Sequence, residues 1–204
     1  MKTKTHYLLV LDQSGSMASD WNSTILAVQN QFKGIQSIQN EIPDVPLEVT
    51  FVTFSDQYYQ HCIAAPPIEL NNIPWNNIFP NSNTALLDAI GKSISNLESR
   101  VGENEDVICL IFTDGGENSS REFTYEKVKE LIESKKEKGW QFNMIGADFD
   151  ALYEGMQIGL NQHEIQNFSK KDLPQYMAFL ENSLKDHSSS KSRNTASFFS
   201  KFKF

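Results

Sequence analysis

Cysteine is scarce in this sequence: Cys62 and Cys109 are the only two, and they lie far apart. Zinc sites are usually built from closely spaced cysteines and histidines, and the sequence has no Cys-x-x-Cys pair or Cys/His cluster. Cys109 lies in an apolar run, where a lone thiol acts as a small core residue. This cysteine usage predicts a reduced, cytoplasmic protein without a zinc site.

Long hydrophobic runs and positive charge are also limited. No run approaches the roughly 18 apolar residues of a membrane span, and the apolar run 7–11 is too short for a secretory signal. Lys and Arg number 18 against 26 Asp and Glu, so the formal net charge is −8. The short apolar runs argue against a membrane span. Since nucleic-acid surfaces need clustered cations, the charge balance argues against nucleic acid as the main ligand.

The composition that is present is that of a folded domain. The chain has 204 residues, of which 39% are hydrophobic and 22% charged. A domain of this size buries enough apolar surface to fold without disulfides or metals. We expect one domain over residues 1–187, followed by a Ser-rich linker and a basic, aromatic tail over 188–204.

Short apolar runs alternate with segments of helical periodicity along the chain. Strands are predicted at 7–11, 47–54, 58–63, 107–112, 142–146 and 165–168. Helices are predicted at 25–38, 86–97, 125–138, 152–158 and 173–184. Between them, residues 66–83 read as a long loop with one short helical turn. This order predicts an α/β fold: a doubly wound, mostly parallel sheet of about six strands with helices on both faces.

Two of the buried strands end in an aspartate followed by a polar, Gly-containing loop. These aspartates are Asp12 and Asp114. In doubly wound sheets, ligands bind beyond the carboxyl ends of the strands, where the strand order reverses. If the two strands are neighbours, both carboxylates meet at that edge. Asp148 and Asp150 follow a further strand, but we interpret them as capping the next helix.

The residues after Asp12 add hydroxyl oxygens to these carboxylates. The segment Asp12-Gln13-Ser14-Gly15-Ser16 presents one carboxylate and two hydroxyls on alternate residues. Hard oxygen donors suit Mg²⁺, Mn²⁺ or Ca²⁺ better than metals that prefer thiolates. A helix cap followed by ordinary turn residues would explain the same pentapeptide without a metal.

Three segments together resemble a known family. Residues 9–17, Leu-Val-Leu-Asp-Gln-Ser-Gly-Ser-Met, resemble the signature of the von Willebrand factor type A (vWA, or integrin I-like) domain. Residues 81–90, with Thr84 ahead of Leu-Leu-Asp-Ala, resemble its Thr-containing loop, although Ser82-Asn83 replaces the frequent Gly-Gly. Residues 112–118 resemble its Thr-Asp-Gly element. The motifs occur in the family's order, and the resemblance covers roughly residues 5–185.

The resemblance implies a Rossmann-like vWA fold with a metal-ion-dependent adhesion site (MIDAS). It implies that the divalent cation is held by these five residues: Asp12, Ser14, Ser16, Thr84 and Asp114. Neutral hydroxyl ligands leave the ion with much of its charge, so an Asp or Glu of a partner protein can complete the site. The expected function is therefore that of an intracellular, non-enzymatic adaptor or subunit. Because Asn tolerates positive φ, we expect Asn83 to preserve the Thr loop.

Two other functions are compatible with the same residues. An Asp at the end of a central strand with Mg²⁺ also describes hydrolases and phosphotransferases that use the Asp as nucleophile, here Asp12. Those enzymes typically carry a second Asp two residues later, where this chain has Ser14. The other alternative is a metal-free scaffold that binds through its C-terminal tail.

Aromatic residues outside the motifs are candidates for contact with a partner. Trp75, Phe79 and Tyr59 could form a rim around the metal or simply cover the edge of the sheet. The tail carries three Phe that we expect to dock, either on this chain, a partner or a second copy: Phe198, Phe199 and Phe202. Exposed clusters of this kind are costly, and docking is favoured over contact with a membrane.

Overall fold

The computed structural model describes residues 4–146, 149–167 and 173–189. Its centre is one six-stranded sheet in the order β3-β2-β1-β4-β5-β6. All neighbouring strands are parallel except the pair β2–β3. The strands are β1 Thr5–Asp12, β2 Leu47–Phe54, β3 Tyr58–Ala65, β4 Asp106–Thr113, β5 Gln141–Gly146 and β6 Ile165–Asn167. The predicted α/β fold is confirmed.

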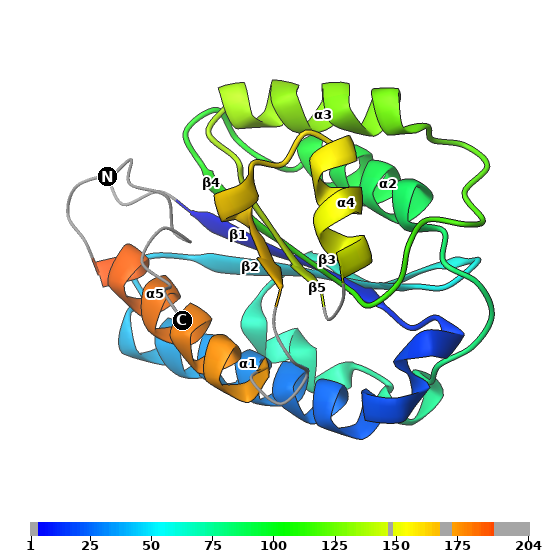
Figure 1. Cartoon of the computed structure of the whole chain (residues 1–204). Coiled ribbons are helices and arrows are strands. Elements are labelled where there is room, and N and C mark those ends of the chain that lie inside the picture. Colours follow the sequence, from blue (N-terminus) through cyan, green and yellow to red (C-terminus); the bar gives the residue numbers. More distant parts are fainter. Residues whose placement is uncertain (1–3, 147–148, 168–172, 190–204) are drawn as a thin grey trace.

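Helices cover both faces of this sheet (Figure 1). The α-helices are α1 Trp21–Glu41, α2 Leu86–Glu98, α3 Tyr125–Glu137, α4 Phe149–Gln157 and α5 Leu173–Ser189. The described residues also include four short 3-10 helices: η1 Gly15–Asp20, η2 Pro67–Asn72, η3 Trp75–Asn77 and η4 Gln162–Glu164. Helices α1 and α5 pack on one face, and α2, α3 and α4 lie on the other (Figure 1).

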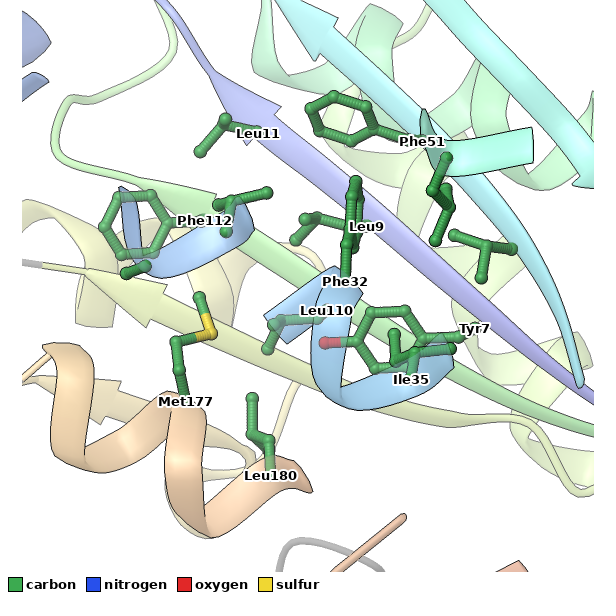
Figure 2. Close-up of a cluster of buried hydrophobic side chains, with 14 of the residues drawn as sticks. Tyr7, Leu9, Leu11, Phe32, Ile35, Phe51, Leu110, Phe112, Met177 and Leu180 are labelled. Carbon is green, nitrogen blue, oxygen red and sulfur yellow. The ribbon is translucent and has the colours of Figure 1, made fainter. Parts of the chain in front are cut away.

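Alternation along the buried strands creates two separate cores. Tyr7, Leu9 and Leu11 of β1 point to the face of α1 and α5, where they share one buried cluster with Phe32 of α1 and Met177 of α5 (Figure 2). Leu8 and Val10 point to the opposite face. Because both faces of the central strands are buried, the sequence shows continuous apolar runs in place of alternation.

The two edges of the sheet are short or irregular. Strand β6 has three residues. Strand β3 pairs with β2 through two register shifts, and Ala64 near its end has a φ of 44°. The Ala64 amide donates to Thr50 Oγ1 (3.0 Å) in place of a regular ladder bond. These features place extra residues in β3 and interrupt its hydrogen-bonded pairing with β2.

The predicted elements differ from the observed ones mainly at their ends. Helix α1 begins at Trp21, four residues before the first residue of the predicted apolar stripe. The loop 66–83 holds two 3-10 helices where one helical turn was predicted. Helix α4 begins at Phe149, so Asp150 lies within it and does not precede it. Helix α5 includes Ser188 and Ser189, which the composition assigned to a linker.

The remaining predictions about the tail concern residues 190–204, which lie outside the described residues. These include the three Phe expected to dock and the possibility of self-association. Asp148 also lies outside the described residues. In the part of the chain that is described, no helix is both long and apolar enough to cross a membrane.

Candidate metal centre

The centre of the site is formed by the neighbouring strands β1 and β4. They pair in parallel with Leu11 opposite Phe112, so Asp12, the last residue of β1, lies next to Thr113. The buried Asp12 carboxylate accepts hydrogen bonds from the Thr113 hydroxyl (2.6 Å) and the Ser14 amide (2.6 Å). The strand order reverses between β1 and β4, so the site lies at the topological switch point.

The two serines connect this carboxylate to the second one. Ser14 Oγ lies 3.1 Å from Ser16 Oγ, and the Ser16 hydroxyl donates to Asp114 Oδ1 (2.6 Å). Ser16 lies in η1, which begins immediately after Ser14 and turns the chain back over the ends of the strands. The first loop and the loop after β4 are therefore joined through side-chain oxygens.

Thr84 enters the site from the third loop. Its amide donates to Asn118 Oδ1 (2.9 Å), and the Asn118 amide donates back to the Thr84 carbonyl (3.0 Å). A Cβ placed on Gly115 would lie 3.5 Å from both Ser16 Oγ and Thr84 Oγ1. Gly115 thus leaves a small space between two hydroxyls, and the five predicted ligand side chains converge from three loops.

Positive φ in the Thr loop occurs at Ser82, not at Asn83. Ser82 has a φ of 58°, and its carbonyl accepts a hydrogen bond from the Gly15 amide (3.1 Å). In the same stretch the Asn81 amide donates to the Gln13 carbonyl (2.8 Å). The expectation for Asn83 is therefore wrong in position. The left-handed residue is the one whose carbonyl must turn toward the Asp12–Ser16 loop.

The donor set fits a hard divalent cation. It combines two carboxylates with three hydroxyls, and all five side chains present oxygen. Nowhere in the described ranges do three or more His, Cys, Asp or Glu side chains gather to hold an ion, so a metal here would depend on the hydroxyls. The space next to Gly115 lies between two of those hydroxyls.

The electrostatics of Asp12 also favour a cation. The pKa of Asp12 is raised to about 6, mainly by burial and in smaller part by the neighbouring Asp114 carboxylate, while hydrogen bonds from Thr113 and Ser14 partly oppose the rise. No Lys, Arg or His in the described ranges forms an ion pair with Asp12. An uncompensated buried carboxylate is costly, and a bound cation would remove that cost.

Ionisation of Asp12 should reduce the stability of the metal-free protein as pH rises from about 4 to about 6. In that range the folded Asp12 retains its proton, whereas the unfolded chain, with a pKa near 3.8, has lost it. The native state therefore binds more protons, and ionising Asp12 costs up to about 3 kcal/mol of unfolding free energy at neutral pH. Denaturant unfolding in EDTA across this range should show a smaller decline for Asp12→Asn than for the wild type.

Asparagine fits this position without loss of hydrogen bonds. Its carbonyl can accept from the Ser14 amide and its amide can donate to Thr113 Oγ1, whose own proton can turn to the Gly115 carbonyl 3.1 Å away. The exposed Asp44, in the turn between α1 and β2 at the amino ends of the strands, provides the control Asp44→Asn. If the unfolding free energy changes equally with pH in the wild type and both variants, the raised pKa of Asp12 is contradicted.

Two residues of the site were not assigned a role from the sequence. The Thr113 hydroxyl holds Asp12, and the Asn118 side chain holds Thr84. Both lie in the Thr-Asp-Gly segment, so the motif located them. Their roles depend on partners that are 101 and 34 residues away in sequence, and no local pattern reports such contacts.

The aromatic candidates occupy different positions relative to this site. Phe79 has 57% of its surface exposed and stands two residues before Asn81, which bonds to the Asp12–Ser16 loop. Trp75 is half-buried against Phe32 and Phe51, with ring centroids 5.8 and 5.7 Å away. Tyr59 is exposed on the edge strand β3. Of the three, Phe79 is the one connected to the Asp12–Ser16 loop, through Asn81.

Comparison with known proteins agrees with this architecture. The family model described as von Willebrand factor type A domain matches residues 8–183. A search of the curated proteins finds no match.

Three solved structures illustrate the structural likeness. Proximal thread matrix protein 1 from the mussel byssus, with a zinc occupied MIDAS motif, superposes with a TM-score of 0.67 at 16% identity, over 90% of this chain and 46% of that one. The pilus adhesin SpaC from Lactobacillus rhamnosus GG, in an open conformation, has a TM-score of 0.72 at 12% identity, over 91% and 30%. The vWF domain of the type V pili tip protein Mfa5 from Porphyromonas gingivalis has a TM-score of 0.67 at 9% identity, over 94% of this chain and 98% of that one.

At identities this low, the TM-scores of 0.67 to 0.72 establish a common fold and nothing more. The chain spans less than half the length of the mussel protein that it matches.

Proposed function

The chain belongs to the von Willebrand factor type A domain family, whose domains bind proteins, and from that premise we propose that it binds an acidic residue of a partner protein through a divalent cation. The observation that carries this proposal is the convergence of two carboxylates and three hydroxyls from three loops at one end of the sheet. Mg²⁺ is the proposed ion, with Mn²⁺ or Ca²⁺ as alternatives of the same hard-oxygen preference.

The roles of the ligands follow from their charges and positions. Asp12, buried and fixed by two hydrogen bonds, would supply the negative charge at the base of the site. Ser14, Ser16 and Thr84 would contribute neutral oxygens, and Asp114 would complete the set directly or through water. A cation bound by mostly neutral donors provides a positive centre for an external carboxylate.

We propose further that the chain is an intracellular adaptor or subunit and not an enzyme. Both Cys62 and Cys109 are free thiols, which supports a reducing compartment. At the position where phosphoaspartyl enzymes typically carry a second Asp, Ser14 donates its amide to Asp12. Mg²⁺-dependent hydrolysis of a generic phosphate ester that is lost in Asp12→Asn would instead support the hydrolase alternative.

A selection from a random displayed peptide library tests the proposal on the full chain. Peptides captured in millimolar Mg²⁺ should be released by EDTA, and each should contain an Asp or Glu that cannot be replaced by Asn or Gln without loss of binding. The Asp12→Asn protein should enrich no such peptides, whereas Asp44→Asn should enrich the same ones as the wild type. Capture that is insensitive to EDTA, or peptides without an essential acid, would refute the proposal.

A further inference from the structure

A groove of about 470 Å³ begins one residue away from the candidate metal ligand Thr84. It lies between the turn from β2 to β3, the first half of α2 and the segment 119–122. Its charged lining residues are Asp56, Asp88, Lys92, Arg121 and Glu122. Phe54, Ala85 and Ala89 are buried apolar residues among this lining, and most of the others are polar or charged.

The groove and the metal centre share one stretch of backbone. The Thr84 amide bonds to Asn118 on one side, and the Ala85 amide bonds to the Ser55 carbonyl (2.7 Å) on the other. A chain whose carboxylate reaches the metal centre can therefore continue directly into the groove.

The charges along the groove are unevenly compensated. Lys92 Nζ forms an ion pair with Glu122 (2.6 Å). The Asp88 carboxylate accepts hydrogen bonds from the amides of residues 121, 122 and 123 at 3.0, 2.9 and 2.9 Å. Within the described residues, the Arg121 guanidinium has no carboxylate at ion-pair distance. Arg121 therefore provides a cation for an incoming ligand, while the exposed Asp56 disfavours an acid beside it.

Arg121 is held on a fixed backbone. Besides the bond from its own amide to Asp88, the preceding turn is anchored by Glu117, whose carboxylate accepts from the amides of Ser119 (2.8 Å), Ser120 (2.7 Å) and Leu87 (2.9 Å). The segment that carries Arg121 is thus tied to the start of α2 at two points. Fixing the backbone reduces the entropy lost when a ligand pairs with the side chain.

We propose that the partner binds as an extended segment with two acidic residues, one at the metal centre and a second paired with Arg121 in the groove. Small or apolar residues of that segment would lie over Ala85 and Ala89. This inference rests on the proposed function and adds to it the partner's chemistry and a residue, Arg121, that determines specificity. Specificity here uses attraction at Arg121 and repulsion at Asp56.

The same peptide selection, repeated with Arg121→Glu, tests the inference. Wild-type peptides should carry a second Asp or Glu at a constant spacing from the essential acid. Replacing that second acid with Gln should weaken binding about threefold to tenfold, the range of one partly exposed charged pair. The Arg121→Glu protein should select Lys or Arg at the second position and retain the essential acid and the dependence on Mg²⁺.

Matched controls separate this inference from the proposed function. Lys127, an exposed cation outside the groove, provides Lys127→Glu, which should select the same peptides as the wild type. Two outcomes would overturn the role of Arg121 and leave the metal proposal standing. In one, the selected peptides contain a single essential acid and show no preference at a second position. In the other, Arg121→Glu selects the same second acid as the wild type. A library without Mg²⁺-dependent peptides would overturn both.

Discussion

Adding Mg²⁺ to the metal-free chain is expected to raise its melting temperature by about 5–10 °C at an ion concentration 100 times the Kd. A ligand that binds only the native state contributes about 2.7 kcal/mol at that concentration, and each kcal/mol shifts the melting temperature of a domain of this size by about 2–4 °C. The physical reason is the Asp12 carboxylate, which is buried without a paired cation in the described residues. Differential scanning fluorimetry across a series of Mg²⁺ concentrations measures the shift.

The variants of Asp12 and Asp44 make this result specific. Asp12→Asn should abolish the shift, and in EDTA at neutral pH it should melt at or above the wild-type temperature because the desolvation cost of the carboxylate is gone. Asp44→Asn should retain the full shift. A shift that persists in Asp12→Asn would show that the ion binds elsewhere, and no shift in the wild type at millimolar Mg²⁺ would contradict a metal site complete without a partner.

Replacing Asp88 with Ala is expected to lower the free energy of unfolding by about 2–4 kcal/mol. The Asp88 carboxylate is mostly buried and accepts three backbone hydrogen bonds, so its removal leaves three amides without acceptors, and hydrogen bonds to charged groups are among the stronger ones. Backbone hydrogen bonding holds the pKa of Asp88 below its ordinary value, although burial alone would raise it. Denaturant unfolding at neutral pH measures the loss.

Two further variants show whether the three hydrogen bonds to the Asp88 carboxylate account for this loss of stability. Asp88→Asn keeps one acceptor oxygen and should lose about half as much stability. Asp186→Ala removes an exposed aspartate from α5 and should change the unfolding free energy by less than about 0.5 kcal/mol. A loss for Asp88→Ala no larger than that for Asp186→Ala would show that the 121–123 amides find other acceptors.

The fold and the candidate ligands could be predicted because their signals are local. Apolar runs such as 7–11 and 107–112 mark strands buried on both faces, and an aspartate at the exit of each marks the functional edge. The pairing of β1 with β4 then brings Asp12 next to the loop of Asp114. The resemblance to the family supplied Thr84, which no spacing rule would have selected.

The supporting interactions could not be predicted because they join distant segments. Asp88 lies on α2 in a helical pattern that gives no sign of the segment 121–123 bound to it. Ser82 adopts a left-handed conformation because of what its carbonyl must reach, although Asn83 is the residue with the better intrinsic preference. Trp75 packs against Phe32 from α1, and the loop sequence does not encode that contact.

The irregular edges of the sheet also affect how this domain can assemble. A regular exposed strand is a template on which another chain can add a strand and continue the ladder. Here the edge strand β6 is three residues long. The other edge strand, β3, is irregular because it contains extra residues and the positive φ of Ala64. Continuous sheets between copies are therefore disfavoured, which agrees with the proposal that a partner is recognised by the loops at the carboxyl ends of the strands.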